Sequence, residues 1–318
     1  MAVDAATFLT YSAIGNREDL SDVIYNIDPT ETPFVSGISK IKSSAVLHEW
    51  QTQALAAVSS INSVLEGDDA TTDTLTATVR LGNYHQISDK VARVSGTQRA
   101  VEHAGRDDEL DYQVSLKGKE LKRDMETIAL ANQGRNAGAA GTPRAIGAVL
   151  SWIFSNTSKG TNGSDPTAAG VGVSTRTDGS VRAFTEAQLK TVLQSAWNNG
   201  GDPDTIMVGG FNKQQFSTFT GRSSPMEEAK SKKIVATVDV YESDFGTLKV
   251  VPNRFQRTRD VLVLEMDMWA LGTLPGRNMV STVLAKTGDS DRKQLLSEYT
   301  IEARNEKASG GVFDVSSS

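Results

Sequence analysis

The sequence predicts an α+β fold from which extended segments leave a compact body. Residues 74–81 alternate apolar and polar side chains, as in a strand with one apolar face. Residues 107–133 carry an apolar stripe at helical spacing. Residues 298–304 return to strand alternation near the end of the chain. Together with an α/β-like stretch after residue 180, these segments indicate mixed helix and sheet.

Composition excludes several classes of protein. The 318 residues are enough for one large domain or two modest ones. The net charge of −6 is unlike that of a strong nucleic-acid binder, which usually carries a basic patch. No run of eighteen apolar residues predicts a membrane span, and the first residues lack the features of a secretory signal. Cysteine is absent and only three histidines occur, so thiolate metal sites are excluded and general bases are scarce.

Residues 1–45 are predicted to form an arm. Residues 17–25 could make two helical turns, and Pro29 and Pro33 then stop any helix. The apolar residues around Phe34 need a partner for burial. Because the arm is too short to form its own core, we expect it to lie on another body.

Residues 46–95 are predicted to form a long β ribbon. A strand over residues 46–52 would pair with the alternating strand over residues 74–81, with an acidic tip at residues 66–69 between them. An isolated two-stranded ribbon is only marginally stable in water. We therefore expect the apolar face of the ribbon to pack against a neighbouring copy of the chain.

The helix over residues 107–133 has the strongest signal. Five apolar residues fall near one stripe, and three acids occupy its first turn, where the helix dipole favours them. Its lysines and arginines interleave with acids, which favours an ion-paired, solvated face over a contact with DNA. Gly134 suits the C-terminal cap.

Residues 155–180 are rich in Gly, Ser and Thr, which is typical of a long, mobile surface loop. A helix should follow a capping box formed by Thr185 and Gln188, with Trp197 on its buried face. Strands are expected over residues 205–208, 234–241, 247–251 and 261–264, and a second helix over residues 211–219. The C-terminal strand over residues 298–304 is expected to be half-buried.

No chemical motif indicates catalysis. His48 and Glu49 open like a zinc-protease motif, but Thr52 stands where the second histidine is needed. Neither a G-x-S-x-G elbow nor a Walker motif occurs. The acids Glu66, Asp68, Asp69 and Asp73 do not have the spacing of an EF-hand; a solvated loop tip, or an ion pair with a neighbour, fits better. We therefore predict no catalytic, cofactor-binding or metal-binding residue and no enzymatic activity.

Eight stretches, in this order along the chain, resemble the major head proteins of tailed bacteriophages. They are residues 27–34 (IDPTETPF), 49–52 (EWQT), 94–98 (VSGTQ), 120–124 (ELKRD), 240–246 (VYESDFG), 286–289 (KTGD), 298–302 (EYTIE) and 304–306 (RNE). No single stretch is diagnostic, but the ordered set is fairly specific and covers most of the chain from about residue 20 to 315.

The resemblance implies the Hong Kong phage-type capsid fold and a virion location after assembly in the host cytoplasm. The implied parts are an N-terminal arm (1–45), an extended β loop (46–100), a peripheral domain with a spine helix (101–144), an axial domain (145–270) and a return to the peripheral domain (271–318). Implied partners are further copies in hexamers and pentamers, with a portal, a scaffold and decoration proteins. The enclosed double-stranded DNA would touch the shell weakly, and no membrane is involved. Whether a scaffold segment is cleaved or is a separate protein stays open.

We expect the arm and the ribbon to lie across neighbouring copies. The expected contact residues are Phe34, Trp50, Glu66, Asp68, Asp69, Leu75, Val79, Arg80, Lys122 and Arg123. Three alternatives stay open at this point: an encapsulin-like nanocompartment, a secreted adhesin or surface-layer protein, and a hydrolase. Electron microscopy of the recombinant protein would separate them best.

Overall fold

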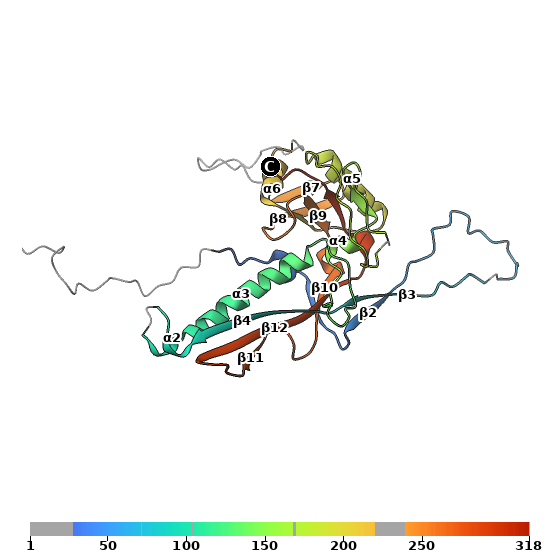
Figure 1. Cartoon of the computed structure of the whole chain (residues 1–318). Helices are drawn as coiled ribbons and strands as arrows, with labels where there is room; N and C mark the ends of the chain where they lie inside the picture. The colour runs from blue at the N-terminus through green and yellow to red at the C-terminus, as the bar shows by residue number, and fades with distance from the viewer. Residues whose placement is uncertain (1–27, 71, 103–104, 168–169, 220–238, 318) are drawn as a thin grey trace, which may run out of the picture.

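The computed structural model describes residues 28–70, 72–102, 105–167, 170–219 and 239–317. They form an elongated part built on a long helix and a sheet, a rounded lobe, and a loop that projects to one side (Figure 1). The helix predicted over residues 17–25 and most of the strand predicted over residues 234–241 lie outside the described residues. The predicted mixture of helix and sheet is confirmed.

The elongated part contains a five-stranded sheet. Its order is β1 (Ser39–Lys42), β10 (Trp269–Thr273), β12 (Ser290–Ala303) and β11 (Val280–Leu284), with β4 (Gln86–Ser95) also paired to β12. Strand β12 is central, and residues 297–303 are all buried. The prediction that residues 298–304 are half-buried is therefore wrong, because α3, β2 and α4 add contacts to this strand.

The long helix α3 spans Glu109–Ala129 and confirms the predicted helix. Asp108 caps it, with its carboxylate accepting from the Leu110 N–H at 2.8 Å. Leu110, Leu121 and Met125 of the predicted stripe are buried. The helix ends at Leu130 rather than Gly134. Gly134 has another role, because a Cβ there would lie 2.2 Å from the Val173 carbonyl oxygen.

The described end of the arm packs on this chain. Helix α1 (Pro33–Gly37) leads into β1, which pairs in parallel with β10. Phe34 is fully buried, at a ring-centroid distance of 6.2 Å from Trp269. Glu126 of α3 accepts from the backbone N–H groups of Phe34 and Val35, both at 2.8 Å. One end of the arm is thus fixed by α3 of the same chain.

The rounded lobe holds a six-stranded sheet. Its order is β5 (Asn156–Ser158), β13 (Gly310–Phe313), β9 (Asp260–Leu264), β6 (Thr205–Val208), β8 (Gly246–Pro252) and β7 (Val240–Ser243). Helices α5 (Glu186–Asn198) and α6 (Gly210–Phe216) pack on it, and the short α4 (Val149–Trp152) lies between lobe and elongated part (Figure 1). The strands predicted at 205–208, 247–251 and 261–264 are confirmed. Strand β13 joins this sheet rather than the one that contains β12. The domain limits expected from the sequence, at residues 145–270 and 271–318, stay a prediction.

Two predictions about the lobe are wrong. Trp197 is 58% exposed and stacks on Phe245, while the other predicted core positions of α5 are buried. The prediction of a surface loop over residues 155–180 is wrong for part of the segment: β5 pairs with β13, and Arg176 is buried, while most of the other described residues lie outside helices and strands. Small residues permit this packing, since a Cβ on Gly160 would meet the Ser180 carbonyl oxygen at 2.1 Å.

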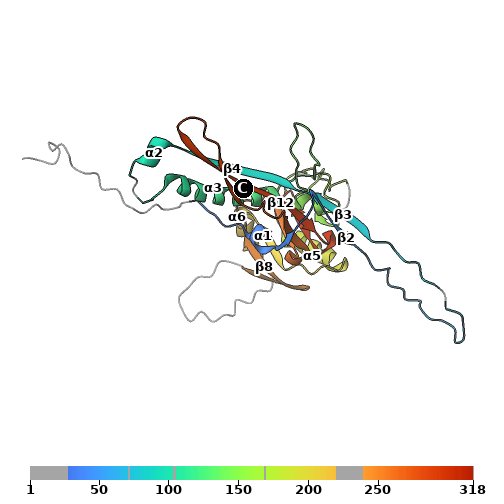
Figure 2. The same cartoon turned by 90° about the horizontal axis from the view of Figure 1, so that it is seen from below.

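The ribbon is shorter than its sequence pattern. Strands β2 (Leu47–Thr52) and β3 (Val79–Tyr84) pair in antiparallel register. Of the strand predicted over residues 74–81, only residues 79–81 are confirmed, since β3 begins at Val79 and pairs there with residues 50–52. Residues 53–78, which we call the extended loop, contain no strand among their described residues and lie far from the body (Figure 2). Three further short elements are α2 (Gly96–Ala100) and the 3-10 turns Met266–Met268 and Glu306–Ala308.

Candidate assembly surfaces

The extended loop exposes a row of large apolar side chains. The exposed fractions are 97% at Leu55, 100% at Val58, 85% at Ile61, 85% at Val64 and 94% at Leu75. Monomeric proteins rarely expose so many apolar side chains together unless they mark an interaction site. The loop is therefore the strongest candidate surface for contact with another molecule.

Leu75 and Val79 are contact residues predicted from the sequence, whereas the apolar residues over 55–65 were not predicted. The available signal was their recurrence every three residues without a strand pattern or a helix cap. This spacing of apolar residues is typical neither of a strand nor of a capped helix in a folded domain. It fits a segment whose apolar side chains are covered by a partner.

The base of the loop is fixed to its own chain. The Trp50 indole N–H donates to the Ala303 carbonyl at 3.1 Å, and its ring lies 5.4 Å from that of Trp152. His48 Nε2 lies 2.7 Å from a carboxylate oxygen of Glu302. Although burial opposes it, the hydrogen bonds from His48 and Arg304 lower the pKa of Glu302. Trp50 therefore anchors the ribbon, with only part of its ring left for a neighbour.

The tip of the loop is acidic. Glu66, Asp68 and Asp69 are exposed and form no ion pair with any described residue. Arg80, at the start of β3, is instead paired with Glu49 across the ribbon. The hydrogen bond with Arg80 lowers the pKa of Glu49. The tip thus carries free negative charge, whereas Arg80 is already neutralised.

Phe34 requires a correction. It was expected to touch a neighbour, but its exposed fraction is 0% and it belongs to the main core of this chain. The arm carries its apolar residues back onto α3 and β10, a pairing between residues far apart in sequence. A side chain with no accessible surface offers none to a second copy.

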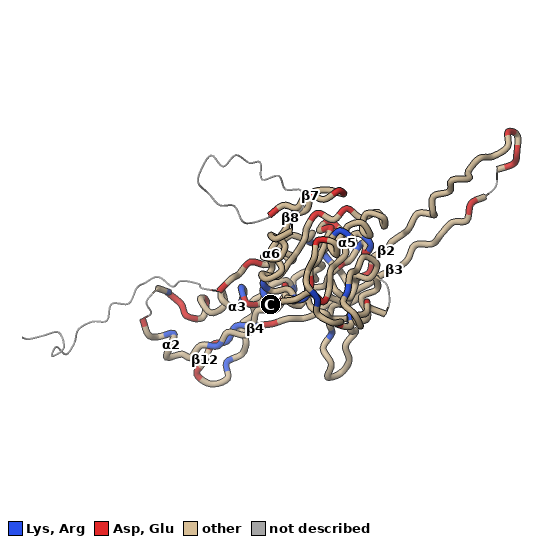
Figure 3. The backbone as a smooth tube through the Cα atoms, turned by 90° about the horizontal axis from the view of Figure 1, so that it is seen from above, with Lys and Arg blue, Asp and Glu red and all other residues tan. Residues whose placement is uncertain are grey.

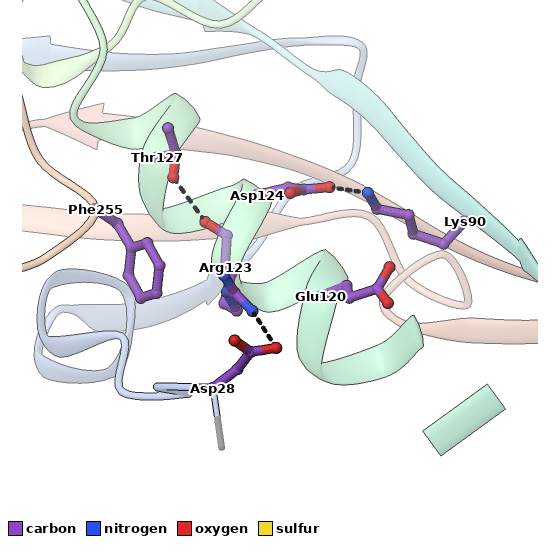
Figure 4. Close-up of a pocket in the computed structure, with 7 residues that line it drawn as sticks. All are labelled: Asp28, Lys90, Glu120, Arg123, Asp124, Thr127 and Phe255. Carbon is purple, nitrogen blue, oxygen red and sulfur yellow. Dashed lines mark hydrogen bonds and ion pairs between the residues drawn. The ribbon is translucent and has the colours of Figure 1, made fainter. Parts of the chain in front are cut away.

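The exposed side of α3 bears the two remaining candidates. Arg123 lines a shallow pocket of about 290 Å³ (Figure 4). Its guanidinium lies 3.8 Å from Asp28 and 5.3 Å from the Phe255 ring centroid. Beside it, Lys90 pairs with Asp124 at 2.7 Å. Arg123 is therefore engaged within the chain, while the exposed Lys122 has no ion pair with a described residue.

A serine and a histidine do approach each other, but in the interior. Ser43 Oγ lies 2.8 Å from His85 Nε2, and both residues are buried. The Ser43 hydroxyl donates to the Ala45 carbonyl, so His85 must donate to that hydroxyl and cannot deprotonate it. Burial lowers the pKa of His85 to about 4. The pair is a structural contact.

Two other features, a metal site and a membrane-spanning helix, are absent from the described residues. Among the described residues, no group of three or more His, Asp and Glu side chains is arranged to hold a metal ion. In the same part of the chain, no helix combines the length and the apolar character needed to cross a membrane.

Comparisons with known sequences point to one family. The family model described as "SU10 major capsid protein" matches residues 5–316. The major capsid protein of Escherichia phage Phieco32 is 27% identical over 343 residues, which cover 96% of this chain and 96% of that protein.

Solved structures share the fold at low identity. A protein of Gordonia phage Cozz has a TM-score of 0.60 at 12% identity, covering 99% of this chain and 97% of its own. The capsid of a native GTA particle has a TM-score of 0.64 at 10% identity, with coverages of 96% and 98%. The capsid of cyanophage A-1(L) has a TM-score of 0.61 at 12% identity, with coverages of 96% and 98%. The expected tailed-phage capsid fold is confirmed.

Proposed function

This chain belongs to the SU10 major capsid protein family, and from that premise we propose that neighbouring copies in the shell are joined through its extended loop. The protein is a structural shell subunit of a phage head. The encapsulin, adhesin and hydrolase alternatives are not favoured by this family assignment. The finer proposal is that the subunits form hexamers and pentamers around double-stranded DNA and have no enzymatic activity.

One observation carries the proposal: the extended loop exposes its apolar residues and makes almost no contact with its own body. Burying one such side chain contributes about 1.5–3 kcal/mol. Most of that gain is available only when another surface covers the loop. In a shell built of copies of this chain, that surface belongs to a neighbour.

Each contact can be modest, because many contacts per subunit raise the effective concentration of the next one. We further propose assembly in the host cytoplasm, together with a portal and a scaffold, and weak contact with the DNA. The net charge of −6 supports a shell whose subunits bind the enclosed DNA only weakly. Expansion during packaging would then be a rigid-body rearrangement of the capsomers.

Deleting residues 60–72 tests the proposal. The variant should fold, because the described residues of this segment make no contact with either core. It should fail to form full-sized shells, because the loop would no longer reach its neighbour. Electron microscopy measures the shells, and thermal unfolding of the free subunit measures the fold.

A matched control replaces residues 60–72 with thirteen Gly and Ser residues, which keeps the length of the loop and removes the apolar and acidic side chains of this segment, Ile61, Val64, Leu65 and the acidic tip. It should also fail to assemble, which assigns the effect to the side chains. Normal shells from both variants would show that the loop does not join neighbours.

A further inference from the structure

Two arginines face each other at the end of the five-stranded sheet. Arg93 of β4 lies directly opposite Arg292 of β12 in the antiparallel register. Ala92 and Val94 cluster with Leu110 of α3, so Arg93 projects from the other face of the sheet. Directly opposite residues share a face, and like charges there are destabilising. The fold thus holds two positive charges together, and their repulsion lowers the stability of the folded chain.

Neither arginine has a counter-charge among the described residues. Arg93 donates to a serine hydroxyl at 2.9 Å, and Arg292 to a backbone carbonyl at 2.7 Å. The Nε of Arg292 is enclosed and has no hydrogen-bond partner in the described part of the chain. The adjacent acid, Asp291, is taken by Arg99 and Lys286 at 2.7 Å each. This arginine pair is therefore built to receive an anion from outside.

The arginine pair is open to other molecules. Arg93 is exposed and Arg292 is half-buried, and both lie on the face of the sheet that points away from α3.

The same chain supplies a matching anion at its opposite end. Residues 53–79 contain four carboxylates and neither lysine nor arginine. Figure 3 shows the acidic tip at one extremity of the molecule and Lys and Arg residues on β4 and β12 toward the other. The tip cannot reach the arginine pair of its own chain, because the loop projects away from that end of the sheet.

We propose that Arg93 and Arg292 receive the acidic tip (Glu66, Asp68 and Asp69) of the extended loop of a neighbouring copy. The inference rests on the proposed function and names the other half of the loop contact. Guanidinium groups bind carboxylates through paired N–H donors. A head-to-tail contact of this kind closes a ring when the rotation between copies is a fraction of a full turn. The packaged DNA is the competing source of anions.

Charge exchange tests the pairing in the full-length chain. R93E/R292E and D68R/D69R should each reduce the yield of shells at least tenfold, because each sets like charges against each other. The combination of all four substitutions should restore the yield to within threefold of the unsubstituted chain. Sedimentation and electron microscopy measure the yield.

Two further variants separate folding from contact. R93Q/R292Q should also assemble poorly, yet its free subunit should unfold at the same temperature or higher, because the repulsion is gone. K40E/K42E, a matched reversal of two exposed lysines on β1, should assemble normally.

Two outcomes would overturn the pairing: no recovery of the shell yield in the variant with all four substitutions, or normal shells from R93E/R292E. If those normal shells held less DNA, the arginines would be assigned to contact with the genome. If the unsubstituted chain formed no shell at all, that result would instead refute the proposed function.

Discussion

Asp260 is a buried acid whose ionised form is disfavoured by its surroundings. It is 1% exposed, and both of its carboxylate oxygens lack a hydrogen-bond donor among the described residues. Arg257 comes no closer than 3.5 Å. Burial outweighs the nearby arginines and raises the pKa of Asp260 from its ordinary value of 3.8 to about 6. The folded chain therefore holds this proton more tightly than the unfolded chain.

Replacing Asp260 with Asn should change the pH dependence of stability. The contribution of the raised pKa is fully present below about pH 4 and is lost as the pH rises through 6. Between pH 4 and pH 7.5, the unsubstituted subunit should lose roughly 3 kcal/mol relative to D260N, since each pKa unit corresponds to about 1.4 kcal/mol. Urea unfolding of the free subunits at several pH values measures this difference.

Asp178 provides the opposite control. Although burial opposes it, the ion pairs with Arg257 and Arg259 lower the pKa of Asp178. Relative to D178N, the unsubstituted subunit should therefore lose stability as the pH falls. A pH-independent difference between D260N and the unsubstituted chain would refute the account of Asp260.

Individual residues show which features of the candidate site could be predicted from the sequence. The acidic tip was predictable, because Glu66, Asp68 and Asp69 have no basic residue near them in the chain. Phe34 was misassigned, because its partner Trp269 is more than two hundred residues away. The arginine pair was missed for the same reason: only the register of β4 with β12 brings Arg93 beside Arg292.

Among the elements, α1 is joined to α3 through one buried carboxylate, that of Glu126. Glu126 is fully buried and accepts from two backbone N–H groups of α1 and from Asn253 at 2.6 Å. Burial raises the pKa of Glu126, against the three hydrogen bonds that it accepts. This carboxylate joins the start of the chain to the long helix and to the lobe.

We expect Glu126→Ala to destabilise the free subunit by about 3 kcal/mol, because it leaves buried donors unsatisfied and opens a cavity. Glu120→Ala, on the solvated side of the same helix, should cost less than about 0.5 kcal/mol. Urea unfolding measures both values. Equal effects of the two substitutions would mean that Glu126 does not hold α1 in place.

Elements with local signals were predicted well and those with distant partners were not. The stripe of Leu110, Leu121 and Met125 is sufficient to place α3. The strand alternation over residues 74–81 misled, since Leu75 has no neighbour to cover it within the chain. The Gly-rich run over residues 155–180 was taken for a mobile loop because its pairing partner, β13, lies at the far end of the sequence.

At the scale of the whole molecule, the chain has two ends of different character. One end projects the extended loop, and the other carries the far ends of β4 and β12 (Figures 1 and 3). The arginine pair lies where Arg93 and Arg292 pair across these two strands. The core between them buries Phe34 within the same chain. The subunit therefore combines a buried core with two ends that are open to contact, which suits a shell of many identical copies.

The two kinds of contact should respond differently to salt. Attraction between the acidic tip and the arginine pair speeds the encounter of subunits and is screened at high ionic strength. The apolar residues of the loop are insensitive to such screening. Raising salt from about 0.05 M to about 0.5 M, where the Debye length falls severalfold, should slow assembly several-fold when measured by light scattering. Finished shells placed in the same high salt should persist, because their apolar contacts are already buried. Shells that dissolve at high salt would show that charge, rather than burial of the loop, holds the lattice together.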